Sequence, residues 1–360
     1  MGARSAPKGA DAGHPATLAL FGREQIRADW MRRIDDKMAK ITSGDYAPRD
    51  FIMTFAKDAD LIRGRSAPGL DDHGQMRSLG DYRADVARVI ESDLADIVLT
   101  SLTTAEVLAE QGSYGRSKAT PAVRLNDPTD LWRVRGGSYA DQPARPYRSL
   151  RLDAIKPYAN LGVYSMTFYN DVTQDRETLR AYSDFRDIAT AVGARHFLEI
   201  TDPACPVDTG DTDYAFFRND VLVRSLAGVA RRERPLFVAV GYHGPAAMEE
   251  LAGWDPSRFV VGVSCCCNGT TTRDCLEMLV QAERHGARVG SFSREAFPCE
   301  EPVLLLRAMR RVIRDGTSSF DAVKAYHNDL RNAGLRPARD LQEDVEITVP
   351  VLKANEARAA

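Results

Sequence analysis

The sequence predicts an α/β fold, a (β/α)8 TIM barrel with an N-terminal capping helix and a C-terminal extension. Short apolar runs rich in β-branched residues alternate with stretches of helical period, and this pairing occurs eight times. Alternation of this kind requires a parallel sheet. Eight units over about 270 residues fit a closed barrel better than an open, doubly wound sheet. The chain has 360 residues and is 44% hydrophobic, so it can bury a large core.

Three segments are expected along the chain. Residues 1–18 are rich in Ala, Gly, Pro and Ser and predict a flexible lead. Residues 19–336 hold the barrel, and they begin with a helix from Arg23 to Ile41 that presents one apolar face as a cap. Residues 337–360 form a tail or arm, in which the run from Val345 to Val349 predicts an extra strand or an arm onto a second subunit.

The strands and helices between these ends follow from the hydrophobic period. The expected strands are 51–55, 96–100, 121–125, 161–168, 196–200, 236–240, 259–263 and 287–292. The expected helices are 81–91, 104–110, 176–192, 220–230, 246–251, 273–285, 303–314 and 319–333. A long loop rich in Arg, Gly and Pro follows the third strand.

Composition argues against several classes of protein. The formal net charge of −3 gives no basic excess for binding nucleic acid. No apolar run approaches the roughly 20 residues of a membrane span, and no continuous apolar signal region is visible. We therefore expect a cytoplasmic protein without a nucleic-acid or membrane partner. The six cysteines lack the spacing of a zinc site, so no metal and no other cofactor is expected.

The stretch from Phe259 to Asp274 predicts a strand, a loop and the start of a helix. Its loop supplies free backbone N–H groups and hydroxyls at a helix N-terminus, an arrangement that holds anions. In barrels, the loops after strands seven and eight are a common phosphate site. The alternative is that Thr271 or Thr272 only caps the helix. The residues expected to bind the anion are Ser264, Gly269, Thr270, Thr271, Thr272, Ser293 and Arg294.

Active sites of barrels lie at the C-terminal ends of the strands, and polar residues occur at these ends. Lys57 and Asp58 end strand one and predict a base, an amine nucleophile, an internal ion pair or simply a solvated turn. Glu199 lies in an apolar strand, where a carboxylate is costly unless paired. It is the first candidate for a general acid–base group. The alternative is a buried salt bridge to Arg124 or Lys57.

Other strand ends add further candidates. Arg124 and Asn126 share one face after strand three and can hold a carboxylate, a phosphate or hydroxyls. Asn170 lies at the end of strand four and is also expected to bind substrate. Tyr242 and His243 end strand six and can orient a carbonyl or move a proton, although a lone His in a turn is often only a hydrogen-bonding group.

Three consecutive cysteines, Cys265, Cys266 and Cys267, end strand seven beside a helix N-terminus. Such a position lowers the pKa of a thiol, so one of them is a candidate nucleophile. A packing role for these small side chains is the alternative.

A set of motifs, taken in chain order, resembles the class I aldolase superfamily. The motifs are AKDAD after the first strand, TPAVRLNDPTDLW in and after the third, LGVYSMTFYND in the fourth, FLEI in the fifth, YHGPAAMEEL after the sixth, GTTTRD after the seventh and AYHNDLRNAGLRP near the end. The nearest branch is that of bacterial deoxyribose-phosphate and bisphosphate aldolase-like barrels. The resemblance spans Phe51 to Arg336. It implies a TIM barrel that cleaves or forms carbon–carbon bonds of phosphorylated sugars through a Schiff base.

The sequence departs from that family at two places. Schiff-base aldolases carry a desolvated lysine near the C-terminal end of strand six, whereas the matching residue here is Ala239. The glycine-rich phosphate loop is replaced by Ser264 and the cysteines, whose side chains restrict approach to the backbone. Three interpretations follow: Lys57 supplies the amine from strand one, the barrel uses acid–base or thiol chemistry, or the barrel is catalytically silent.

We therefore expect a lyase, or a related isomerase, that acts on a small anionic and phosphorylated carbonyl compound. The reaction would be carbon–carbon bond cleavage or formation, or the related enolisation, without the usual strand-six lysine. A homo-oligomer is expected. The alternative is a non-catalytic aldolase relative that binds a phosphorylated metabolite or a partner.

Overall fold

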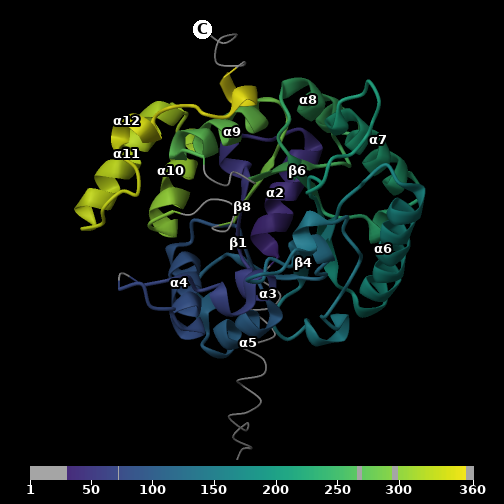
Figure 1. Cartoon of the computed structure of the whole chain (residues 1–360), viewed down its shortest axis with the longest axis horizontal. Helices are drawn as coiled ribbons and strands as arrows, with labels where there is room; N and C mark the ends of the chain where they lie inside the picture. The colour runs from purple at the N-terminus through teal and green to yellow at the C-terminus, as the bar shows by residue number, and fades with distance from the viewer. Residues whose placement is uncertain (1–30, 72, 266–269, 294–298, 354–360) are drawn as a thin grey trace, which may run out of the picture.

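A closed barrel of eight parallel strands forms the centre of the protein, and a ring of helices surrounds it (Figure 1). The computed structural model describes residues 31–71, 73–265, 270–293 and 299–353. Each strand pairs with the next one in the chain, and β1 pairs with β8 to close the barrel. The predicted fold is thus confirmed. The strands are β1 (Ile52–Lys57), β2 (Ile97–Thr100), β3 (Thr120–Arg124), β4 (Leu161–Met166), β5 (Arg195–Ile200), β6 (Val238–Gly241), β7 (Val261–Cys265) and β8 (Val289–Ser293).

The strands are buried on both faces, and alternate residues therefore belong to two different apolar cores. In β1, Ile52 and Ala56 join the cluster inside the barrel, whereas Met53 and Phe55 join the cluster between the strands and the helices. Side chains two apart in a strand share a face. This alternation decides which polar residues at the strand ends face the interior.

Helices fill the outer layer, and several begin earlier than the hydrophobic period predicts. Asp171 caps α6 by accepting hydrogen bonds from the amides of Thr173 and Gln174, and Asp213 caps α7. The polar residues Thr173, Gln174 and Asp175 in the first turn of α6 carry no apolar period, which explains the earlier start of that helix. The α-helices after β1 are α3 (Ala59–Arg63), α4 (Leu79–Ser92), α5 (Leu102–Glu110), α6 (Val172–Val192), α7 (Tyr214–Ala227), α8 (Pro245–Gly253), α9 (Thr272–Arg284), α10 (Pro302–Arg314), α11 (Ser319–Asn332) and α12 (Leu341–Asp344).

Short 3-10 helices shape the loops. They are η1 (Pro48–Asp50), η2 (Gly64–Ser66), η3 (Ser113–Arg116), η4 (Thr129–Leu131), η5 (Tyr139–Asp141), η6 (Leu152–Ala154) and η7 (Arg231–Glu233).

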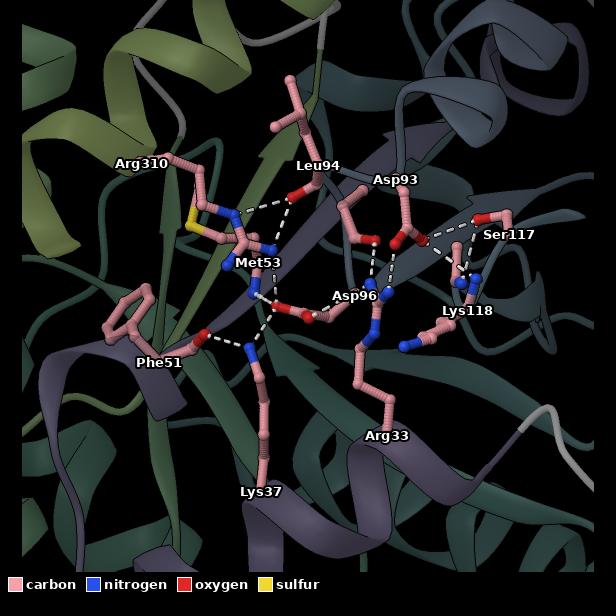
Figure 2. A network of polar contacts seen from close by, with 12 residues as sticks. Arg33, Lys37, Phe51, Met53, Asp93, Leu94, Asp96, Ser117, Lys118 and Arg310 are labelled. Carbon is pink, nitrogen blue, oxygen red and sulfur yellow. Dashed lines mark hydrogen bonds and ion pairs between the residues drawn. The ribbon is translucent and has the colours of Figure 1, made fainter.

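Helix α2 (Arg32–Ser43) closes the N-terminal end of the barrel, as the predicted capping helix should. Its buried Ile34 joins the inner core. Lys37 on α2 donates to Asp96 at 2.8 Å, and Arg310 of α10 reaches the same carboxylate at 3.2 Å (Figure 2). Asp96 also accepts the amide of Met53 at 2.8 Å. This carboxylate therefore ties the cap to both β1 and the outer helices. The predicted helix residues before Met31 and the lead 1–18 lie outside the described residues.

The tail packs on its own barrel, and the described residues from 337 to 353 contain no strand. Val345–Val349 was expected as a strand or as an arm onto a second subunit. In the structure, the amide of Thr348 donates to Asp274 at 2.8 Å, and Ile347 and Leu352 are buried. The segment follows α12 as irregular chain because its polar groups bond to α9 rather than to a sheet edge. Within the described part of the chain, no helix is both long and apolar enough to span a membrane.

Candidate active site

Arg124 is the centre of a charged cluster inside the C-terminal mouth of the barrel. It is the last residue of β3 and is only 4% exposed. Its Nε donates to Asp58, its Nη1 to Ser165 Oγ at 2.7 Å and its Nη2 to Glu199 Oε2 at 3.3 Å. Burial acts to lower the pKa of Arg124, but the charges of Asp58 and Glu199 outweigh it and raise that pKa. The guanidinium therefore stays charged.

Glu199 faces the same interior from β5. Ser165 donates to its Oε2 at 2.7 Å, and the side chain is 19% exposed, so it is reachable from the mouth. The ion pair with Arg124, expected as the alternative for Glu199, is present. Ala239 is the register partner of Glu199 on β6, so the position without a lysine lies beside this carboxylate.

Lys57 lies on the opposite face of β1, which corrects its predicted place in the site. Its Nζ is 3.9 Å from Asp85 Oδ2 and 4.6 Å from the centroid of the Tyr82 ring, and both partners belong to α4. The side chain is 2% exposed. Because it alternates with the inward Ala56, Lys57 points into the helix layer and cannot reach across the mouth. Its neighbour Asp58 does face inward, toward Arg124.

Tyr242 and His243 are separated by the same alternation. Tyr242 is buried in the outer layer and donates to Gln281 of α9 at 3.2 Å, so its predicted catalytic place is also corrected. The ring of His243 is 3.0 Å from Asp202 Oδ1 and is 33% exposed. A Cβ at residue 241 would collide with the Asp202 carboxylate, which explains the glycine there.

Arg218 of α7 supports this Asp–His pair. Its guanidinium lies 3.8 Å from Asp202 and donates to the Gly241 carbonyl at 3.1 Å. Burial lowers the pKa of Arg218. Asp202 lies in the loop directly after β5, the strand of Glu199, and was not among the predicted site residues. Its signal is an acidic residue three places after a strand glutamate.

Two predicted binding residues hold neighbouring chain segments instead. The side-chain amide of Asn126 donates to the Ser165 carbonyl at 2.8 Å and accepts a hydrogen bond from the Ser165 amide at 2.7 Å, where the β3–β4 ladder ends. Asn170, with φ of 53°, donates to the Asp208 carbonyl at 2.7 Å and is exposed. Both side-chain amides therefore hold backbone segments around the mouth in this structure.

The predicted anion site needs a similar correction at the start of α9. Thr271 caps the helix and donates to the Glu346 carbonyl at 2.7 Å, while the amide of Thr272 donates to Asp344 Oδ1 at 2.7 Å. Both threonines are buried. The tail therefore already places a carboxylate on this helix N-terminus, and the capping alternative describes these two residues.

Hydroxyl groups on three neighbouring strands remain for an anion or for substrate hydroxyls. Ser264 pairs in register with Ser291, which pairs in register with Thr54, so the three lie side by side around the barrel. The hydroxyls of Ser264 and Thr54 are buried and have no hydrogen-bond partner among the described residues. Thr270 is half-buried in the loop after β7.

Several predicted residues lie outside the description. Cys266, Cys267, Gly269 and Arg294 are outside the described residues, and for Cys265 and Ser293 only the backbone, at the ends of β7 and β8, is described. No group of three or more His, Cys, Asp or Glu side chains in the described ranges could hold a metal ion.

Two further acids lie near the mouth. Asp130 of η4 is 5% exposed and accepts a hydrogen bond from Thr167 at 2.7 Å. Asp60 lines a cavity of about 860 Å³ with Leu61, Ser101, Leu102 and Leu150, over the ends of β1 and β2. Burial raises the pKa of both carboxyls.

Comparison with solved structures supports the fold. An archaeal fructose 1,6-bisphosphate aldolase is similar with a TM-score of 0.53 at 12% identity, covering 77% of this chain and 98% of that one. The fructose-bisphosphate aldolase from Slackia heliotrinireducens is similar with a TM-score of 0.55 at 11% identity, covering 84% and 92%. An archaeal enzyme with its catalytic lysine bound to the carbinolamine intermediate gives 0.53 at 14%, covering 77% and 98%.

No protein-family model and no curated protein matches the sequence. The structural likenesses show that the chain has the barrel fold of these aldolases, which is the fold that the sequence predicted.

Proposed function

We propose that the protein is an aldolase-like enzyme that acts on a small anionic carbonyl compound, phosphorylated in the simplest case. The reaction is carbon–carbon bond cleavage or formation, or the related enolisation. The observation that supports it most is the cluster of Arg124, Asp58, Glu199 and Ser165 inside the mouth of an aldolase-type barrel. A homo-oligomer and a cytoplasmic location are part of the same proposal.

Glu199 is the proposed general base. Its carboxylate forms an ion pair with Arg124 and remains partly exposed. In the cleavage direction it takes the proton of the substrate hydroxyl beside the breaking bond. The bond electrons move onto the carbonyl to give an enolate, and the aldehyde leaves. Arg124 and the hydroxyls of Ser264 and Ser291 stabilise the developing negative charge.

Imine chemistry is disfavoured by where the lysines lie. Seven of the eight lysines fall in the described residues. Lys57 packs against α4, Lys37, Lys40 and Lys118 line the N-terminal end, and the other three are exposed. Ala239 occupies the position at which the family resemblance implies an amine. We therefore favour acid–base chemistry over the Schiff base that the carbinolamine structure represents.

The substrate anion remains a proposal with a reduced set of residues. The hydroxyl of Ser264 has no hydrogen-bond partner among the described residues, and Ser291 is its register partner on β8. Gly269, Thr270, Ser293 and Arg294 keep their proposed roles. Thr271 and Thr272 are left out because the tail already binds them. Cys265 and Cys267 remain candidate thiols in this proposal.

The test is turnover on a panel of phosphorylated ketoses and aldehydes, followed by borohydride treatment of the active enzyme with substrate. We expect turnover and no reduced lysine adduct. An adduct on any lysine would overturn the acid–base mechanism. Tight binding of a sugar phosphate without turnover would instead indicate a non-catalytic relative. Cys265→Ser and Cys267→Ser, assayed singly, separate nucleophilic thiols from packing, because a nucleophile cannot be replaced without loss of turnover.

A further inference from the structure

A second polar layer lies directly above the Arg124 cluster. Asp130 Oδ2 accepts a hydrogen bond from Thr167 Oγ1 at 2.7 Å, and Thr167 Oγ1 lies 2.5 Å from Thr201 Oγ1. Thr201 Oγ1 lies 3.3 Å from the Met166 carbonyl. The second carboxyl oxygen of Asp130 is buried and has no partner among the described residues. The chain of hydroxyls therefore leads from a buried acid toward the mouth.

This chain joins the proposed site through strand alternation. Thr167 lies two residues after Ser165, and Thr201 lies two residues after Glu199, so both face the interior one layer closer to the mouth. Thr167 is only 1% exposed, whereas Thr201 is partly exposed. A substrate bound over Glu199 would meet the hydroxyl of Thr201 and could not touch Asp130.

The hydroxyl protons have two consistent arrangements. If Asp130 is ionised, Thr201 donates to Thr167 and Thr167 donates to the carboxylate. If Asp130 is protonated, it donates to Thr167, Thr167 to Thr201 and Thr201 to the Met166 carbonyl or to a substrate. Each hydroxyl has one proton and can both donate and accept. Moving a single proton along the chain thus converts one arrangement into the other.

We propose that Asp130 is a second acid–base group of the proposed enzyme and acts on substrate through Thr167 and Thr201. The inference rests on the proposed function. Its proton passes to Thr167, that of Thr167 to Thr201 and that of Thr201 to the enolate oxygen, which leaves an enol and an ionised Asp130. When the enol becomes the ketone, its hydroxyl proton returns by the same route. Glu199 gives the proton it removed to the carbon, so both acids are restored.

The surroundings of Asp130 fit a carboxyl that starts as an acid. Burial raises its pKa, against the smaller effects of the hydrogen bond from Thr167 and of Arg133 and Arg124, whose positive charges face it. Tyr169 is a further titratable group that the charge of Asp130 influences, and burial raises its pKa to about 12, so it stays neutral. An uncharged carboxyl also lowers the cost of the oxygen that has no partner.

Substitutions along the chain test the relay. Asp130→Asn and Thr201→Val should each lower turnover by about 100-fold, while Thr201→Ser, which keeps the hydroxyl, should retain it. Asp130→Asn should also remove the fall in turnover at high pH that marks loss of the acid's proton. Thr348→Val is the matched control, since it removes a threonine–aspartate hydrogen bond at 2.5 Å in the tail. Its turnover should not change.

The charge of Asp130 gives a readout that is separate from turnover. We expect infrared difference spectra of wild type against Asp130→Asn to show a protonated carboxyl at neutral pH. An ionised Asp130 in an active enzyme, or equal turnover of Thr201→Val and Thr201→Ser, would overturn the relay alone. If no carbonyl compound turns over, the relay falls together with the proposed function.

Discussion

The two ends of the barrel differ in how completely their buried polar groups are paired. At the N-terminal end, the carboxylate of Asp96 receives Lys37, Arg310 and the Met53 amide, with Arg33 at 3.6 Å (Figure 2). At the C-terminal end, buried oxygens of Ser264, Thr54 and Asp130 have no partner among the described residues.

A buried polar group without a partner costs about 1–3 kcal/mol. A fully paired network can therefore be explained by stability, whereas an incomplete one indicates groups that wait for a ligand. We infer that Asp96 stabilises the packing of the cap, and the unpaired oxygens support the proposal that the mouth is the end that meets substrate.

The largest expected effect is on turnover at the mouth. Glu199→Gln keeps the shape and the hydrogen bond to Ser165 but removes the base, so turnover should fall by about 10²–10⁴-fold. The free energy of unfolding should change little, because the buried Arg124 keeps its ion pair with Asp58. Turnover assays and urea denaturation measure the two effects.

Glu177→Gln is the control for this change, since its ion pair with Arg145 is exposed on both sides. If Glu199→Gln were strongly destabilised yet fully active, the mouth would be structural and the comparison between the two ends would fail.

The second prediction concerns Asp96 at the N-terminal end of the barrel, where a substitution should change stability rather than turnover. Asp96→Asn leaves Lys37, Arg33 and Arg310 without their buried counter-charge, which should cost about 3–5 kcal/mol of unfolding free energy. Turnover per folded molecule should not change. Urea denaturation compares this variant with Asp36→Asn, an exposed residue of α2. Equal stabilities of the two variants would remove Asp96 from its structural role.

The third prediction concerns acid sensitivity of the outer layer. His196, buried against Tyr182 of α6, has its pKa lowered by burial to about 3. In the unfolded chain this imidazole binds a proton near pH 6.5, whereas in the folded protein it stays neutral down to about pH 3. Stability is therefore lost as the pH falls from about 6.5 to 3, and the loss reaches about 2 kcal/mol by pH 5. His196→Phe should lack this part of the pH dependence in denaturation curves. Parallel curves for both proteins would contradict it.

The smallest effects are expected for Tyr242 and His243, two adjacent residues at the end of β6. Tyr242→Phe removes a buried hydrogen bond to Gln281 and should cost about 1 kcal/mol of stability with no change in turnover. His243→Asn should lower turnover with little change in stability, because the imidazole is exposed toward the mouth. Thermal unfolding and turnover of both variants decide it. The reverse pattern would place Tyr242 back in the site.

The sequence was sufficient for the architecture. A salt bridge from Glu199 to Arg124 or Lys57 was expected only as the alternative to a general base, and the pair with Arg124 is present. All eight strands were predicted from apolar β-branched runs, because each strand is buried on both faces and has no competing pattern. Which residue faces inward at a strand end depends on one position of register. For this reason Lys57 and Tyr242 were assigned to the wrong face, although their neighbours Asp58 and His243 lie in the mouth.

Contacts between distant segments escaped prediction for a different reason. Asp130 reaches Thr167 from a loop after β3, and Asp344 reaches Thr272 across 72 positions of sequence. Local period and spacing carry no information about such pairs. The tail looked like a strand because Val345–Val349 alternates apolar and polar residues, but its amides bind Asp274.

The hydrogen bonds between the tail and the start of α9 have a consequence for the order of folding. Thr271 and Asp274 cap α9 locally, and Asp344, Glu346 and Thr348 of the tail add further hydrogen bonds to its first turn. A ribosome that has just made β7, α9 and β8 has not yet made these tail residues. We therefore expect the tail to dock on α9 after β8 is available to pair with β1 and close the barrel.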